Sequence, residues 1–319
     1  MDVTLPIGEF DGVDRISPFV TRNADSFILD IALEKPVIDP DTYSLSIGGP
    51  YVNNPLTLSY DDLLNFEHVS RPVCLVCISN PIGGELVKNV VYTGVPLSVL
   101  LDEAGFDDPT DPTRQIYSTA ADGYTGGFRA PLAYDGRAAM VALFANGEPL
   151  AVEHGFPARL VVAGEFAQTS ATKWLESIEV NDFFEVDSFW VPRGWAKEAP
   201  VKTSSRIDTP LDRTPLTSST TTIAGVAWAP EHGIERVEVG ISDGSVGLES
   251  VRWADADVGS VESDETWVQW IYEWEANTPG DWFTQVRATD KSGFTQSPVV
   301  VSPAPDGAEG YDTTMVTVI

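Results

Sequence analysis

Apolar and polar residues alternate with two different periods in the first two thirds of the chain. In residues 42–49, Tyr43, Leu45 and Ile47 are separated by single polar residues, which is the period of a half-buried strand. Residues 58–64 are expected to begin a helix, with Ser59 as its N-cap and two aspartates in the first turn, where the helix dipole favours negative charge. The pattern therefore predicts strands mixed with short helices.

Two further segments extend this mixture. Residues 95–106 place Val95, Val99 and Leu100 on one stripe, and Gly105 follows it, which predicts a second helix with glycine as its C-terminal stop. Residues 159–164 form a short continuous apolar run that begins with Arg159, which is typical of a buried strand. Together these elements indicate an α+β domain.

The last hundred residues contain strand patterns only. Three runs, 236–241, 268–274 and 282–288, alternate faces and are separated by turn-forming clusters. The residues expected to face a core are Val237, Val239, Ile241, Val268, Trp270, Tyr272, Trp274, Trp282, Thr284, Val286 and Ala288. Short strands without helices predict an all-β sandwich of immunoglobulin type. We expect a linker near residues 207–222, which divides the chain into domains 1–212 and 213–319.

Length and composition agree with a folded protein of two domains. The 319 residues are 43% hydrophobic, which is too apolar for a disordered chain and long enough for two cores. No run of about 18 apolar residues predicts a transmembrane helix. The first 15 residues have neither the basic nor the apolar region of a signal peptide.

The formal net charge is −29, from 19 basic and 48 acidic residues. Such a surface excludes unspecific binding to nucleic acid, which needs a basic face, and it is repelled by anionic membranes. The acidic residues are spread along the chain and lysine is scarce, so we expect a salt-adapted source organism, in which salt screens the self-repulsion. An ordinary acidic protein is the alternative interpretation.

Cys74 and Cys77 are the two cysteines of the chain. A thioredoxin-like dithiol needs a helix N-terminus, whereas residues 73–78 have the pattern of a strand, and a zinc site needs four ligands. Two buried, inert thiols are the simpler interpretation. Cys77, however, ends the apolar run just before a loop with Asn80 and two glycines, where a thiolate facing a cavity is suited to a soft, redox-active metal.

A second cluster of candidate residues begins at His154. Arg159 opens a buried-strand pattern, where an unpaired guanidinium is costly, so it needs an anion. Residues 154–213 hold seven of the 19 basic side chains and nine acids. They are Arg159, Lys173, Arg193, Lys197, Lys202, Arg206 and Arg213. This concentration indicates either a phosphate or pterin site or internal salt bridges.

Several segments together resemble the sulfite oxidase family of molybdopterin-dependent oxidoreductases. In the first domain they are CISNPIGG (77–84), YTGVPLSVLLDEAG (92–105), NGEPLAVEHGFPARLVVAG (146–164), SATKWL (170–175), FWVPRGW (189–195) and VKTSSRID (201–208). In the second they are GVAWAPEHGIERVEV (225–239), WVQWIYEWEA (267–276) and QVRATDKSGFTQ (285–296). The resemblance runs from about residue 16 to the end, and it rests on the number and order of the motifs.

The resemblance implies a sulfite-oxidase-type molybdopterin-binding domain, followed by an immunoglobulin-like domain that often mediates dimerisation in relatives. It implies a molybdenum-molybdopterin cofactor with Cys77 as the metal ligand. The other residues that it assigns to cofactor binding are Asn23, His154, Arg159, Gln168, Thr169 and Lys173.

The chain departs from the family pattern at the substrate site. Sulfite oxidases of the family bind sulfite with arginines near molybdenum, whose positions correspond here to Ile82 and Ile28, and an active-site tyrosine corresponds to Trp195. We therefore expect Trp195 and Arg193 to line the pocket with Ile82 and doubt that sulfite is the substrate. Arg22 and Arg193 are the candidates for restoring positive charge from other directions.

The first function hypothesis is an oxidoreductase that transfers an oxygen atom on a small substrate, with a sulfoxide or N-oxide as likely a substrate as sulfite. It requires a separate electron-transfer partner and allows a homodimer formed through residues 213–319. The second is a cofactor-free binding or structural protein that kept the scaffold. The resemblance leaves the compartment open, with a soluble, extracytoplasmic or membrane-tethered segment of a longer chain as the expectations.

Overall fold

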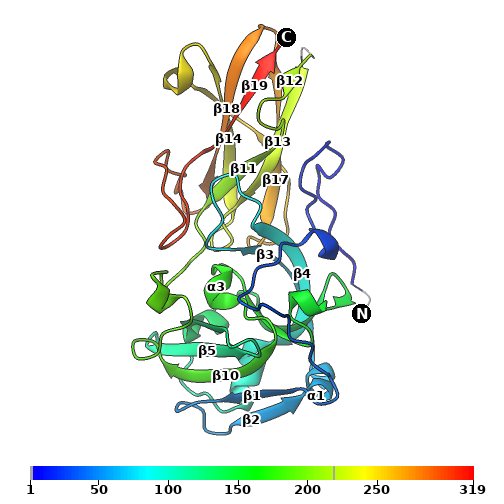
Figure 1. The fold of residues 1–319 in the computed structure, drawn as a ribbon, viewed down its shortest axis with the longest axis vertical. Coiled ribbons are helices and arrows are strands. Elements are labelled where there is room, and N and C mark those ends of the chain that lie inside the picture. Colours follow the sequence, from blue (N-terminus) through cyan, green and yellow to red (C-terminus); the bar gives the residue numbers. More distant parts are fainter. Residues whose placement is uncertain (1–2, 218–219) are drawn as a thin grey trace.

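The computed structural model describes residues 3–217 and 220–319, which form an elongated molecule with two regions along its axis (Figure 1). Strands predominate, and the α-helices among the described residues are short: α1 (Tyr60–Asn65), α2 (Leu97–Glu103) and α3 (Ala167–Ser170). Within the same residues, every helix is too short or too polar to cross a membrane.

The first region contains two sheets. One has the strand order β2-β1-β10-β5-β6. Its strands are β1 (Ser44–Gly48), β2 (Leu56–Ser59), β5 (Arg114–Ala120), β6 (Thr125–Arg129) and β10 (Leu175–Asp182). The other has the order β3-β4-β7-β8, with β9 paired to β7. Its strands are β3 (Val69–Val76), β4 (Val87–Pro96), β7 (Ala139–Ala145), β8 (Glu148–Pro149) and β9 (Arg159–Val162). A large apolar core joins these sheets and the two first helices.

The strand and the helix expected near residues 43–64 are confirmed. Leu45 and Ile47 of β1 are almost fully buried, as the period of two requires. Helix α1 begins after Ser59, whose hydroxyl accepts a hydrogen bond from the backbone N–H of Asp62 at 3.1 Å. The Asp62 carboxylate accepts the Ser59 N–H at 2.9 Å, which completes a capping box.

The second helix is confirmed, and its expected buried stripe is right at Leu100 but wrong at Val99. Strand β4 continues to Pro96, so Val95 belongs to the strand, and Val99 is 42% exposed. The helix instead buries Leu97, Leu100 and Leu101, at the i, i+3, i+4 spacing of one face. It ends before Gly105, whose φ of +75° confirms the expected stop.

The second region consists of two sheets that enclose one core. The first has the order β11-β13-β17-β16 and the second β12-β19-β18-β14-β15. Their strands are β11 (Ser204–Thr209), β12 (Pro215–Leu216), β13 (Thr220–Trp228), β14 (Ile234–Asp243), β15 (Arg252–Asp255), β16 (Asp257–Val258), β17 (Trp267–Glu275), β18 (Gly280–Asp290) and β19 (Asp312–Val318). The three predicted alternating runs lie in β14, β17 and β18 and turn their apolar faces into this core.

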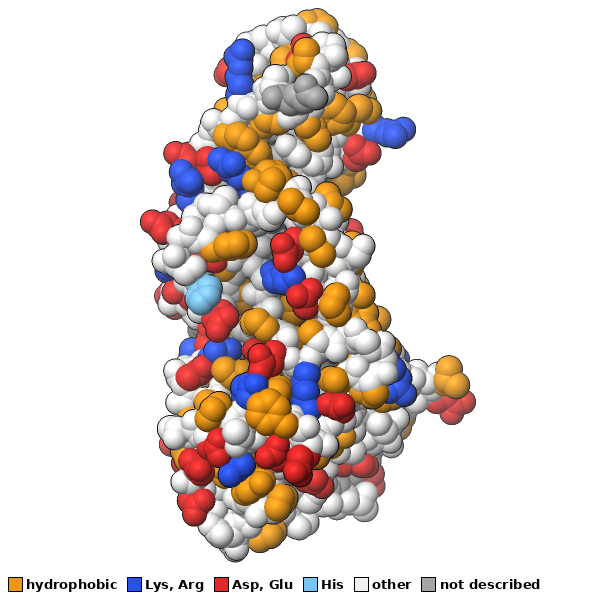
Figure 2. All heavy atoms as spheres, turned by 90° about the vertical axis from the view of Figure 1, so that its left-hand side faces the viewer, with side chains coloured by type: hydrophobic (Ala, Val, Ile, Leu, Met, Phe, Trp, Pro, Cys, Tyr) orange, Lys and Arg blue, Asp and Glu red, His pale blue; other side chains and the backbone are white. Residues whose placement is uncertain are grey.

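The expected linker near 207–222 is partly strand. Strand β11 already pairs with β13 of the second region, so that region recruits residues before position 213. A further apolar cluster joins the two regions, with Cys74 and Val76 of β3 packed against Val226, Trp228 and Trp267. In the face shown in Figure 2, acidic side chains lie dispersed along both regions with basic ones among them.

Candidate active site

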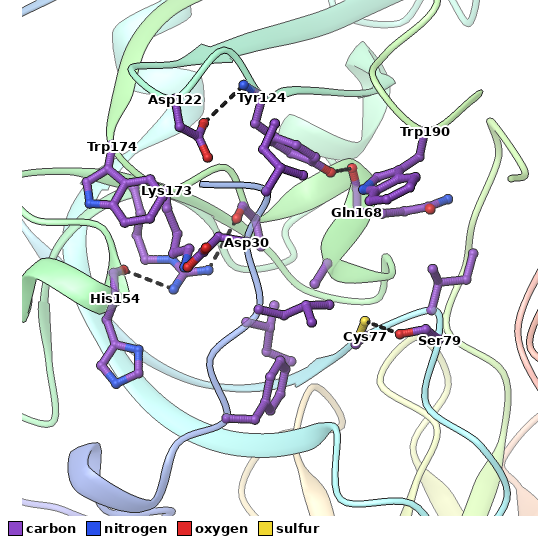
Figure 3. A pocket seen from close by; sticks show the side chains of 18 of the residues that line it. Asp30, Cys77, Ser79, Asp122, Tyr124, His154, Gln168, Lys173, Trp174 and Trp190 are labelled. Carbon is purple, nitrogen blue, oxygen red and sulfur yellow. Dashed lines mark hydrogen bonds and ion pairs between the residues drawn. The ribbon is translucent and has the colours of Figure 1, made fainter. Parts of the chain in front are cut away.

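A cavity of about 480 Å³ lies in the first region, between strands of the second sheet and the segments around α3. Figure 3 shows Cys77, Ser79, Gln168 and Trp190 on one side of it, and His154, Lys173 and Trp174 on the opposite side. We call the first group, with Trp195, the thiol side. We call Lys88, His154, Arg159 and Lys173 the cation side.

Cys77 follows directly on β3 and lines the cavity together with Leu75, two residues earlier on the same face of the strand. Its backbone N–H donates to the carbonyl of Leu86 at 2.9 Å, and the Ser79 hydroxyl lies 3.0 Å from its sulfur. Cys74 points to the opposite face, into the apolar joint with the second region, where burial raises the pKa of its thiol. The two cysteines are therefore not equivalent, and Cys77 is the one that faces the cavity.

The loop after Cys77 is held by its own polar groups. The Asn80 side-chain oxygen accepts the backbone N–H of Leu86 at 2.9 Å, and the N–H of Asn80 donates to the carbonyl of Cys77 at 3.0 Å. Gly83 has a φ of +67°, which the turn requires. These contacts fix the direction of the Cys77 side chain without any ligand.

The rest of the thiol side is aromatic and uncharged. The Tyr124 hydroxyl, which also lines the cavity, donates to the carbonyl of Gln168 at 2.5 Å, and the Gln168 side-chain amide donates to the carbonyl of Ala196 at 2.8 Å. The rings of Trp190 and Trp195 meet edge to face, with centroids 6.5 Å apart. Their orientation presents flat apolar surface beside the thiol.

Two residues with positive φ angles, Gly155 and Trp174, position Lys173. Gly155 has a φ of +103°, and a Cβ at this position would lie 2.9 Å from the Cβ of Lys173. Trp174 has a φ of +49° and is fixed by its indole N–H, which donates to the carbonyl of Val152 at 2.8 Å. The Lys173 ammonium donates to Asp30 at 2.7 Å and to the carbonyl of Glu153 at 3.0 Å.

His154 is buried at the same side, with its Nε2 3.2 Å from the carbonyl oxygen of Asn23. Burial, and next the positive charge of Lys88, lower the pKa of His154 to about 4. The imidazole is therefore neutral near pH 7 and is available as a hydrogen-bonding group.

Arg159 and Lys88 are both 97% buried, yet within the described residues neither forms an ion pair with a carboxylate. The Arg159 guanidinium donates to the carbonyls of His154 at 3.1 Å and Ala171 at 3.3 Å, and its Nε has no partner there. Unpaired buried cations are costly unless an anion compensates them. The donor set fits a ligand with a phosphate group and a thiolate-bound soft metal.

Salt bridges explain most of the other basic side chains between residues 154 and 213. Five of the seven pair with an acid: Lys173, Lys197, Lys202, Arg206 and Arg213. The interpretation as internal salt bridging therefore applies to these five. Arg159 is the one of the remaining two that faces the cavity.

Some expected site residues lie outside this cavity. Asn23 lines a separate hollow of about 440 Å³ and reaches His154 only through its carbonyl. Thr169 is a buried residue of α3, and its hydroxyl donates to the carbonyl of Phe166 at 3.0 Å. Arg193 is exposed, because its guanidinium stacks on Phe189 at 3.7 Å from the ring centroid. Arg193 thus does not line the cavity as expected, whereas the cofactor contacts assigned to Asn23 and Thr169 stay predictions.

The two isoleucines expected near the substrate are also absent from the wall. Ile28 is 47% exposed, and Ile82 packs beside Gly310 of the second region. Arg22, offered as a source of positive charge, is exposed and pairs with Asp25 at 2.6 Å. Trp195 lines the cavity, and its role toward the substrate stays a prediction.

The sequence reasoning missed Lys88, Asp30, Tyr124 and Trp190, which all line the cavity. Lys88 could have been noticed in the sequence, because it is the charged residue of the mostly apolar segment VKNVVYTGV. Asp30 had none, since its segment reaches the cavity through tertiary contacts alone.

Comparison with known proteins gives one matching family model, an oxidoreductase molybdopterin binding domain, over residues 32–190. Mitochondrial sulfite oxidase of Homo sapiens is 27% identical over 330 residues, covering 89% of this chain and 57% of that protein. The NADPH nitrate reductase of Phytophthora infestans is 33% identical over 189 residues, covering 50% of this chain and 21% of the reductase.

Among solved structures, the sulfane dehydrogenase SoxCD from Paracoccus pantotrophus is similar, with a TM-score of 0.74 and 25% sequence identity. The match covers 88% of this chain and 75% of that one. The chain thus spans only about a fifth to just over half of the length of the two curated relatives above.

Proposed function

Since this chain belongs to the sulfite oxidase family of molybdopterin-dependent oxidoreductases, we propose that it is an enzyme that transfers an oxygen atom to or from a small substrate. The observation that carries the proposal is the arrangement of one cavity. A fixed thiol lies on one side of it, and buried cations without carboxylate partners lie on the other.

In this proposal Cys77 binds molybdenum, and three residues of the cation side, His154, Arg159 and Lys173, hold the pterin and its phosphate. Bound there, the cofactor supplies a metal that exchanges an oxygen atom and two electrons with the substrate. Arg159 contributes a planar fork of donors and Lys173 a point charge, while neutral His154 contributes a ring nitrogen. Trp190 and Trp195 exclude water from the thiol side.

We propose a neutral sulfoxide or N-oxide as the substrate, in preference to sulfite. Among the described residues, the thiol side has aromatic rings and no arginine or lysine, and an anion entering it would lose its hydration without gaining a cation. Reduction of a sulfoxide takes up two electrons and two protons and yields a sulfide and water. The electrons come from a separate redox partner.

A substrate panel tests this choice, with a reduced redox dye as electron donor for sulfoxides and N-oxides and its oxidised form as electron acceptor for sulfite. We expect turnover of neutral sulfoxides or N-oxides and little oxidation of sulfite. Sulfite oxidation that is as fast as the best turnover in the panel would overturn the substrate assignment while leaving the cofactor assignment intact.

Metal analysis tests the cofactor assignment. We expect molybdenum in protein purified from its native host in high salt, loss of that metal in Cys77→Ser, and retention in Cys74→Ser. Cys74 is the matched control, because it faces away from the cavity on the same strand. Native protein without molybdenum would favour a cofactor-free scaffold instead.

For the second region we propose an immunoglobulin-type sandwich that forms a homodimer. Its two sheets, each of four or five strands around one core, support the fold, and the match to SoxCD supports a shared architecture. Light scattering after size exclusion in high salt tests the dimer, and a monomer over the micromolar range would contradict it.

A further inference from the structure

Lys88 is the least expected residue of the cavity wall. It lies on β4, whose other side chains are mostly apolar and buried, and it pairs across the sheet with Leu75. Because Cys77 lies two residues beyond Leu75 on the same face, Lys88 is its diagonal neighbour in the sheet. Its side chain therefore leaves the sheet on the face of the cavity.

The surroundings of Lys88 are positive. Burial, followed by the charges of Arg159 on β9 and Lys173 after α3, lowers its pKa well below the ordinary value for lysine. His154 adjoins from the segment before β9. The acceptor that the described residues offer its ammonium is the carbonyl oxygen of Phe27, at a long 3.4 Å.

Among the described residues, Asp30 is the carboxylate that forms an ion pair with a cation of this cluster. Asp30 accepts from Lys173 at 2.7 Å and lies 3.6 Å from Lys35. Asp30 thus neutralises Lys173, whereas Lys88 and Arg159 keep no anionic partner among the described residues. Two buried cationic groups remain uncompensated, which matches the charge of a phosphate monoester dianion.

We propose that Lys88 is an additional anion-binding residue of this cavity, which together with Arg159 receives a dianionic phosphate group. The inference rests on the proposed function, because the phosphate of the pterin cofactor is the anion expected there. Lys88 destabilises the protein without ligand and stabilises the complex. A lysine kept only for packing would stabilise both.

The test compares thermal unfolding of the cofactor-free full chain in phosphate and in chloride at equal ionic strength. The variants are Lys88→Met, of similar length without charge, Lys88→Arg, and Lys291→Met as an exposed control on the second region. Lys88→Gln replaces Lys88→Met if the latter does not fold.

We expect Lys88→Met to raise the melting temperature in chloride, because an unpaired buried charge is removed. The same variant loses the stabilisation by phosphate, with a Kd for inorganic phosphate raised about 10- to 100-fold, as for one charge-assisted hydrogen bond. Lys88→Arg and Lys291→Met keep the phosphate response.

The inference fails if Lys88→Met lowers the melting temperature equally in both salts, or if phosphate stabilises Lys88→Met as strongly as the parent protein. It also fails if phosphate has no effect on the parent. Molybdenum analysis separates the two proposals. A Lys88-dependent phosphate response in a protein that never holds molybdenum overturns the proposed function and supports the anion site.

Discussion

The two sides of the cavity are built on opposite principles. On the thiol side, the polar groups of Tyr124 and Asn80 and the side-chain N–H of Gln168 have hydrogen-bond partners within the chain. On the cation side, Lys88 and Arg159 are buried without a carboxylate in the described part of the chain. On the thiol side the Gln168 side-chain oxygen is the neutral atom left without a partner among the described residues, whereas the cation side lacks counter-charge for two cations.

This difference separates stability from binding. Buried charges that lack partners reduce the free energy of unfolding. A ligand that binds only the folded state raises that free energy again. The thiol side fixes the position of the Cys77 sulfur, whereas the cation side provides binding affinity for an anionic ligand. Substitutions on the two sides should therefore change different measurements.

A buried carboxylate outside the cavity provides a reference for the cost of uncompensated charge. Burial raises the pKa of Glu165 to about 7, although Arg137 opposes the shift. A carboxyl with a raised pKa contributes stability that is present below about pH 4.5 and is lost as the pH rises through 7. Glu165→Gln should thus stabilise the protein at pH 8 by about 3 kcal/mol at most, and hardly at pH 4.5.

Urea unfolding at the two pH values measures this effect, with exposed Glu185→Gln as the control. Equal stability changes at pH 4.5 and pH 8 would show that Glu165 is not strained by its burial. The comparison would then lose its reference for the cation side.

Arg159→Met should weaken retention of the cofactor about 10- to 100-fold, because it removes charge-assisted hydrogen bonds. Arg159→Lys should fall between the parent and Arg159→Met, since the charge remains and the planar fork is lost. The molybdenum-to-protein ratio after prolonged dialysis measures the difference. If Arg159→Met retained all of its molybdenum, the cation side would not be the part of the cavity that provides affinity for the cofactor.

Trp195→Ala should raise KM for a neutral substrate about fivefold and leave the molybdenum content unchanged, because the indole contributes apolar and aromatic contact on the thiol side. Steady-state kinetics with the best substrate of the panel measures it. Phe184→Ala, which removes an exposed ring outside the cavity, serves as the control. Loss of metal in Trp195→Ala would place this residue on the cofactor instead.

Ser59→Ala should lower the free energy of unfolding by about 1 kcal/mol through loss of the N-cap of α1. The loss should be the same with and without cofactor, because α1 is outside the cavity. Denaturant titration of both forms measures it. A cofactor-dependent difference would contradict the separation of stability from binding.

Local features were predictable from the sequence. The cap at Ser59 and the stop at Gly105 depend on residues within one or two turns, and both are confirmed. The alternating strands of the second region depend on a period of two, which the core of that region confirms. Family motifs directed attention to Cys77 and Arg159, which the fold brings to one cavity.

Features decided by distant contacts were not predictable. The segment near 207–222 has the composition of a linker, yet its first residues pair with β13, because a strand edge needs a partner more than a particular composition. The guanidinium of Arg193 stacks on the ring of Phe189 and does not line the cavity. Asp30 meets Lys173 across 143 positions of sequence, and no local pattern records that pairing.

The segment with Phe27, Leu29, Asp30 and Ile31 forms part of the cavity wall, although the matched family domain begins at residue 32. Trp195 likewise lies beyond its end at residue 190. A fragment trimmed to that domain would keep the thiol and the arginine but open the cavity at both rims. A protein fragment meant to carry the complete site therefore has to extend beyond the matched domain at both ends, to include Phe27 and Trp195.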